Sequence, residues 1–145
     1  MSTLRQYCTF TLDGFLMGVE VSRVQEIIRY QEMTPVPLAH RVVRGLINLR
    51  GQIVTALDLR RRLELPERAP DALPTNVVVR TDEGAVSFLV DEIGDVVEVD
   101  DSSFERPPET LQGVAKQLIT GAHKLSNRLL LLLDVERAAS LRDDA

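Results

Sequence analysis

Hydrophobic and polar residues alternate along the start of the chain, and this period of two predicts half-buried β-strands. The alternation covers residues 8–12 and 15–21, with the dipeptide Asp13-Gly14 between them. Asp-Gly is a favoured hairpin turn because glycine adopts a positive φ without strain. A β-hairpin is therefore expected near the start of the chain.

A short helix is predicted directly after this hairpin. Ser22 and Gln25 have the spacing of a capping box, with Ser22 as the helix cap. Val24, Ile27 and Ile28 would then form the buried side of the helix, with Ile27 in the core.

A second hairpin is predicted where Arg50-Gly51 joins apolar strands at residues 46–49 and 53–57. Asp58 follows the second of these strands. Because aspartate is a good N-cap, Asp58 is expected to start a short helix.

The later part of the chain is predicted to contain further strands after a proline-containing linker at 66–75. These strands are expected at residues 77–79, 86–90, 93–99, 118–119 and 129–133. Residues 100–109 are expected to form a polar loop. Asp134 is expected to cap a terminal helix over 134–141.

The two halves of the chain resemble each other, which indicates an internal repeat. Residues 21–28 line up with 90–97, and residues 42–59 line up with 118–135. Each half supplies about five short strands, and closing them into a small barrel would remove exposed strand edges. The two barrels are expected to pack together with a groove between them, because neither half can bury a large core alone.

Composition and charge exclude several classes of function but say little about the fold. The chain of 145 residues is long enough for one domain, and its net charge of −5 disfavours nucleic acid, which needs a basic face. Its two tyrosines and four phenylalanines are few for stacking bases. The single cysteine, Cys8, excludes an internal disulfide and fits a reducing cytosol. No apolar run approaches the roughly 20 residues of a membrane-spanning helix.

The sequence offers no recognisable pattern for catalysis, a metal or a cofactor. His40 and His123 lie in different halves and are expected at the surface, while Cys8 is expected to be buried on an apolar strand face. A hydrolase would need a nucleophile beside a base, and Asp58 and Asp134 are better explained as helix caps. We therefore expect a protein without enzymatic activity, metal or cofactor.

Two charged runs are interpreted as solvated surface. The acidic run at 91–101 lacks the ordered ligand pattern of a calcium loop, so its carboxylates are expected on the outer faces of strands. Arg60, Arg61 and Arg62 lie towards the end of the predicted helix, where cations complement the helix dipole.

An ordered set of motifs resembles the CheW domain family, over about residues 7–139. The most specific part is Gly45–Gly51, followed by an apolar strand and Asp58–Arg60. Other matching pieces are Phe10–Leu12, Gly18–Val21, Val24–Ile27, Pro35–Pro37, Ile53-Val54, Val90-Asp91 and Ile119–Gly121. Two positions depart from the family pattern: Thr55, where proline is common, and Ser87, where glycine is common.

The resemblance implies a mostly β fold of two packed five-stranded Src-homology-3-like barrels, with a few short helices and a C-terminal helix. Residues 1–145 would form a single CheW-like domain. The first barrel would cover about 14–65, and the second about 72–134 together with the N-terminal strand 5–12.

The resemblance also implies a function. The chain would be a stand-alone, non-catalytic adaptor of chemotaxis-type signalling, cytoplasmic and recruited to the inner face of the membrane through receptor arrays. Its partners would be the regulatory domain of a CheA-type histidine kinase and the cytoplasmic hairpin tip of chemoreceptors. Neither nucleic acid nor direct membrane contact is expected.

The implied receptor contact is Arg50, positioned by Glu26, because a guanidinium fixed in a turn offers a planar fork of donors to a carboxylate. The alternative is that Arg50 only solvates the turn. Val24 and Ile28 would line the apolar groove between the barrels, and the barrel ends would contact the kinase. The predicted partner-binding residues also include three glycines, at positions where the backbone needs a positive φ or a close approach. They are Gly45, Gly51 and Gly121.

Overall fold

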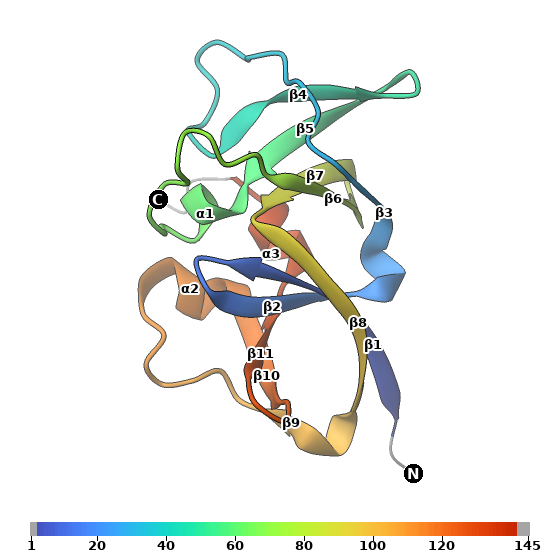
Figure 1. Cartoon of the computed structure of the whole chain (residues 1–145), viewed down its shortest axis with the longest axis vertical. Coiled ribbons are helices and arrows are strands. Elements are labelled where there is room, and N and C mark those ends of the chain that lie inside the picture. The colour runs from blue at the N-terminus through green and yellow to red at the C-terminus, as the bar shows by residue number, and fades with distance from the viewer. Residues whose placement is uncertain (1–2, 142–145) are drawn as a thin grey trace.

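The fold is mostly β, as the alternating pattern predicts. The computed structural model describes residues 3–141, and within them eleven strands form two sheets joined by short helices. The sheets lie one above the other along the long axis of the molecule (Figure 1). We name the sheet that contains the first and last strands sheet A, and the other sheet B.

Sheet A has the strand order β8-β1-β2-β11-β10-β9. Its strands are β1 (Leu4–Leu12), β2 (Phe15–Glu20), β8 (Glu92–Asp100), β9 (Phe104–Glu105), β10 (Ile119–Lys124) and β11 (Leu129–Leu133). Sheet B has the order β3-β6-β7-β5-β4. Its strands are β3 (Val24–Ile28), β4 (Val43–Leu49), β5 (Gln52–Asp58), β6 (Thr75–Thr81) and β7 (Gly84–Val90).

Short helical segments lie at the connections between strands. They are the 3-10 turns η1 (Val21–Arg23) and η2 (Asp101–Ser103) and the helices α1 (Leu59–Arg62), α2 (Gly113–Leu118) and α3 (Val135–Ala139). Asp58 caps α1 by accepting a hydrogen bond from Arg60 N–H over 3.0 Å, and Asp134 caps α3 by accepting one from Arg137 N–H over 3.0 Å. Both predicted caps are confirmed, although the terminal helix ends at Ala139 rather than at residue 141. Across residues 3–141, none of these helices has the length and hydropathy needed to cross a membrane.

The predicted internal repeat is present in the strand pairing. The β4–β5 hairpin has a register shift between Val43 and Gly45, and the β10–β11 hairpin has one between Ile119 and Gly121. The two hairpins therefore correspond in detail, including a β-bulge at the same position in each.

The parallel strand pairs fix the alignment of the two halves. In sheet B, Ala56 of β5 pairs with Ser87 of β7, and in sheet A, Leu132 of β11 pairs with Gly18 of β2. Gly18 precedes Ser87 by 69 positions and Ala56 precedes Leu132 by 76, which are the offsets of the two sequence alignments. Residues of the strands aligned in this way thus have defined counterparts in the other half.

The sheets do not follow the predicted barrel boundaries, which were 14–65 for one barrel and 72–134 with 5–12 for the other. β2 lies in sheet A beside β1, and β6 and β7 lie in sheet B with β3 and β5. The tight Asp13-Gly14 turn pairs β2 with β1 along its whole length, so this hairpin cannot be divided between two sheets. Each sheet therefore combines a hairpin from one half with the remaining strands of the other half.

The predicted helix after the first hairpin is wrong. Residues 24–28 form strand β3, preceded only by the three-residue turn η1. Ser22 does not cap this turn, and its hydroxyl instead lies 3.5 Å from a carboxylate oxygen of Glu20. The β-branched residues Val24 and Ile27 favour the strand, which pairs antiparallel with β6.

The main core draws on both sheets. Phe10 and Leu12 of β1 and Phe88 of β7 are 0% exposed and belong to one continuous cluster. A smaller cluster lies around Leu130 in sheet A and another around Val78 in sheet B. The two sheets therefore share a hydrophobic core, as expected for halves too small to fold alone.

Candidate protein-interaction surface

Arg50 lies at the tip of the β4–β5 hairpin, on a turn with a fixed backbone. Arg50 and Gly51 have φ angles of 51° and 92°, the two positive values that a two-residue type I′ turn requires. The side-chain oxygen of Asn48 accepts a hydrogen bond from Gly51 N–H over 2.8 Å and braces the turn. The Arg50 side chain is 73% exposed, so its guanidinium is presented to solvent. The predicted hairpin and the positive φ of Gly51 are confirmed.

Glu26 binds the guanidinium of Arg50, as expected. Arg50 Nη2 donates to Glu26 Oε2 in a salt bridge, and the Glu26 side chain is only 20% exposed. Glu26 lies on β3 and Arg50 on the β4–β5 turn, so the ion pair joins the two opposite edges of sheet B. The sheet is therefore curled. Because a guanidinium carries five N–H donors, Arg50 keeps donors for a further carboxylate.

Two of the predicted glycines are required by close backbone approach. A Cβ added to Gly45 would lie 2.7 Å from the carbonyl oxygen of Thr34, and the φ of Gly45 is 156°. Thr34, in the segment between β3 and β4, exchanges two backbone hydrogen bonds of 2.9 and 2.8 Å with Leu46, and these hold the segment over Gly45. A Cβ added to Gly121 would lie 2.2 Å from the ring of Phe104. The close approach expected at both glycines is confirmed.

The apolar residues of β3 differ in their burial. Val24 is half-buried against the main core, and Ile28 is half-buried against the smaller cluster of sheet B. Ile27 is 40% exposed, so its predicted place in the core is wrong. A register shift between Val24 and Glu26 accounts for this, because a bulge changes which side chains point inward. Gly121 is the one member of the predicted set that lies in sheet A.

Sequence reasoning missed a buried ionic cluster beside α1. Asp58 is 0% exposed and accepts hydrogen bonds from Arg44 over 3.1 Å and from Arg68 over 3.2 Å. Asp91 accepts hydrogen bonds of 2.6 to 2.9 Å from Arg60 and Arg68. The predicted solvation of Asp91 and Arg60 is therefore wrong. The linker brings Arg68 into this cluster, and no local sequence signal indicates that contact.

The cluster sets the charge state of Asp91. Burial by itself would raise the pKa of the Asp91 carboxyl. Hydrogen bonds from Arg60, from the backbone N–H of Asp13 and from Arg68 outweigh burial and hold the pKa below its ordinary value. Asp91 therefore stays ionised and ties sheet A to sheet B.

His123 is buried, so its predicted surface position is wrong. It is 1% exposed on β10 and lies beside the rings of Tyr7 and Phe104, with centroids 6.0 and 5.8 Å away. The Ser103 hydroxyl is 2.8 Å from His123 Nδ1, while Nε2 makes no hydrogen bond within the described part of the chain. Burial lowers the pKa of His123 and outweighs the opposite effect of the Asp101 charge.

The other candidate reactive groups lie where the sequence predicts. Cys8 is buried, and burial raises the pKa of its thiol. His40 is exposed. Residues 3–141 contain no group of three or more histidine, cysteine or carboxylate side chains that could hold a metal ion.

The structure accounts for one departure from the family pattern. The Ser87 hydroxyl donates to the side-chain oxygen of Asn76 over 2.7 Å, and both residues are 0% exposed. A serine is therefore accommodated in β7 because its buried hydroxyl has a partner. Thr55 is half-buried in β5, between Leu46 of β4 and Val86 of β7.

Comparison with known protein families decides which family this fold represents. The family model described as the CheW-like domain matches residues 6–142. The chain belongs to the CheW-like domain family.

Similar relatives include chemotaxis proteins, which match over most of their length. The chain is 32% identical over 134 residues to the chemotaxis protein CheW of Bacillus subtilis (strain 168), covering 92% of the chain and 86% of the relative. It is 27% identical over 142 residues to the chemotaxis protein CheW of Treponema pallidum (strain Nichols), covering 95% and 84%.

A solved structure agrees with the fold. The crystal structure of the scaffolding protein TtCheW from Thermoanaerobacter tengcongensis aligns with a TM-score of 0.84 at 23% identity. The alignment covers 94% of this chain and 92% of that chain. The two-sheet fold of this CheW-like protein is thus the fold of TtCheW.

Proposed function

We propose that this CheW-like protein couples a CheA-type histidine kinase to the cytoplasmic tips of chemoreceptors, as an adaptor without catalytic activity or cofactor. Its relatives are named chemotaxis proteins, and the similar solved structure is named a scaffolding protein. It would act in the cytoplasm, at the inner face of the membrane, through receptor arrays. It would bind neither nucleic acid nor the membrane itself.

The receptor contact is assigned to Arg50 and its neighbours on β3. The observation that carries this assignment is an exposed guanidinium fixed on a type I′ turn and anchored to Glu26. A side chain held in this way loses less conformational entropy on binding than a free one. Val24 and Ile28, on the same strand as Glu26, supply the proposed apolar part of the groove.

The kinase contact is assigned to the barrel ends, which correspond to the hairpin ends of sheets A and B. The internal repeat supports this assignment, because the two halves present equivalent hairpins with equivalent bulges at Gly45 and Gly121. A partner built from the same kind of domain could pack such ends against its own. Gly45 and Gly51 would maintain the backbone shape of the first half.

Replacing the guanidinium tests the receptor assignment. In the Arg50→Ala variant we expect the affinity for a receptor cytoplasmic fragment to fall about tenfold, because a central arginine contact is lost. Affinity for the kinase regulatory domain should be unchanged. The free energy of unfolding should change by less than about 1 kcal/mol, since exposed ion pairs contribute little. Isothermal titration calorimetry and urea denaturation measure these quantities.

The matched control is Arg106→Ala, which removes an exposed arginine that follows β9 in sheet A. This variant should bind the receptor fragment as the wild type does. If Arg50→Ala also binds the receptor fragment with unchanged affinity, the assignment of Arg50 is wrong.

A further inference from the structure

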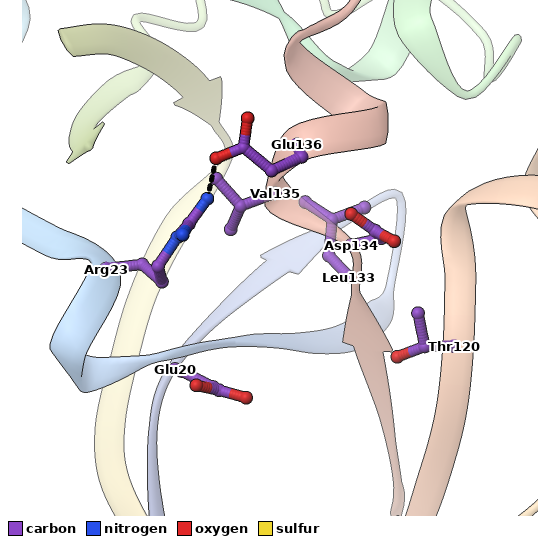
Figure 2. Close-up of a pocket in the computed structure, with 7 residues that line it drawn as sticks. All are labelled: Glu20, Arg23, Thr120, Leu133, Asp134, Val135 and Glu136. Atoms are coloured by element: carbon purple, nitrogen blue, oxygen red, sulfur yellow. Dashed lines mark hydrogen bonds and ion pairs between the residues drawn. The ribbon is translucent and has the colours of Figure 1, made fainter. Parts of the chain in front are cut away.

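A cavity of about 300 Å³ opens where the two halves of the chain meet beside α3 (Figure 2). One wall comes from the end of β2 and from η1, and the other comes from β10 and from the junction of β11 with α3. Arg23 forms an ion pair with Glu136 across the cavity. The polar lining residues are Glu20, Arg23, Thr120, Asp134 and Glu136.

Two carboxylates of the lining, those of Glu20 and Asp134, form only long ion pairs. Glu20 is half-exposed and has Arg5 Nη1 at 3.8 Å, and Asp134 is 27% exposed and has Arg137 Nε at 3.8 Å. Asp134 also accepts the capping hydrogen bond from the Arg137 backbone. The residues that line the cavity include three carboxylates and one guanidinium, that of Arg23, so the lining itself carries a net negative charge.

The internal repeat gives this cavity a counterpart in the other half. The capping aspartates have nearly the same backbone conformation, with φ and ψ of −79° and 107° at Asp134 and −80° and 108° at Asp58. The offsets set by the strand pairing define three corresponding pairs: Asp134 with Asp58, Thr120 with Arg44, and Glu20 with Leu89.

Guanidinium groups occupy the counterpart. Arg68 Nη1 donates to both carboxylate oxygens of Asp58 over 3.2 Å, and Arg68 Nη2 donates to the Leu89 carbonyl over 3.3 Å. Arg44 Nη1 donates to Asp58 Oδ2 over 3.1 Å. The Arg68 side chain is only 7% exposed, so this is a built and nearly closed arginine site. The fold therefore shows which chemistry fits at this position.

We propose that the open cavity accepts the guanidinium of an arginine side chain from a partner protein. Thr120 replaces Arg44 and leaves the space unfilled, while Glu20 replaces Leu89 and adds a carboxylate. Asp134 and Glu20 would then bind the incoming group from two sides. A planar fork of donors suits this arrangement better than a compact ammonium group. This site lies outside the proposed receptor contact and goes beyond the adaptor function.

A peptide titration of the full-length, isotope-labelled protein tests this site by nuclear magnetic resonance. The probe is the capped tripeptide Gly-Arg-Gly, compared with the lysine peptide and the uncharged citrulline peptide. We expect saturable shifts of the Glu20, Thr120 and Asp134 amide resonances with the arginine peptide, weaker binding of the lysine peptide, and none of the citrulline peptide. Equal responses to arginine and citrulline, or shifts confined to other regions, would overturn the proposal.

Two variants with different structural effects locate the binding. Asp134→Asn keeps a good helix cap but removes the charge. This variant should bind the arginine peptide with about tenfold lower affinity. Thr120→Arg supplies the counterpart of Arg44, fills the cavity and should abolish binding. Glu92→Gln, which neutralises an exposed carboxylate on β8, is the control and should bind like the wild type. Wild-type affinity in Thr120→Arg would show that the peptide binds elsewhere.

Discussion

Asp58 and His123 show how burial changes the role of a single residue. The sequence predicts that Asp58 caps a helix, and the structure confirms it. The structure also shows a buried contact between Asp58 and Arg68 that no local sequence pattern indicates. His123 lies between Tyr7 of β1 and Phe104 of β9, so its burial depends on packing that periodicity does not describe. By contrast, the Arg50–Glu26 pair was anticipated from the family resemblance and is present. At the residue scale, the Arg50–Glu26 pair was predictable, whereas the Asp58–Arg68 contact and the burial of His123 were not.

The depressed pKa of His123 makes the stability of the fold sensitive to mild acid. The unfolded chain takes up the proton first, because its histidine titrates near the ordinary value of 6.5 while the folded value lies lower. The stabilisation is therefore complete above about pH 6.5 and is lost as the pH falls through the folded pKa. We expect the free energy of unfolding to decrease between about pH 7.5 and 5.5.

Urea denaturation across this pH range measures the effect. His123→Gln, which does not titrate, should show a flatter pH dependence than the wild type. His40→Gln removes the exposed histidine and should retain the wild-type slope. The same slope in His123→Gln and in the wild type would contradict the assignment.

Hairpins were the elements that the sequence predicted best, because their turns are chosen by local chemistry. Asp13-Gly14 and Arg50-Gly51 both join antiparallel strands, and the positive φ angles expected of such turns are present. The region after Ser22 was mispredicted because its capping-box spacing is also a local signal, and pairing with β6 overrides it. Pairing with strands distant in sequence decides such segments, and local patterns cannot report it.

The two glycines of the β4–β5 hairpin should differ in their tolerance of substitution. Gly45→Ala places a Cβ against the Thr34 carbonyl and is expected to cost about 3 kcal/mol or more of unfolding free energy. Gly51→Ala meets no neighbouring atom within 4 Å, so only the positive φ opposes it, at about 1 kcal/mol. Urea denaturation of the two variants measures the difference. An equal loss in both variants would contradict the role given to the Thr34 contact.

At the scale of the whole molecule, the internal repeat was predictable but the exchange of hairpins between sheets was not. The offsets of the sequence alignment reappear in the strand register, whereas the predicted barrel boundaries separate β1 from β2. The periodicity of apolar residues identifies strands but does not determine which strands pair with one another in a sheet. The cavity beside α3 and the cluster around Asp91 both lie where the two halves of the chain meet.

The most direct test of the adaptor proposal is an analytical ultracentrifugation experiment with three components. They are this protein, the regulatory domain of a CheA-type kinase and a chemoreceptor cytoplasmic fragment. We predict that a much larger fraction of the kinase domain and the receptor fragment sediments as one complex when this protein is present. Failure of this protein to bind either partner, or equal association of the two partners without it, would contradict the proposal.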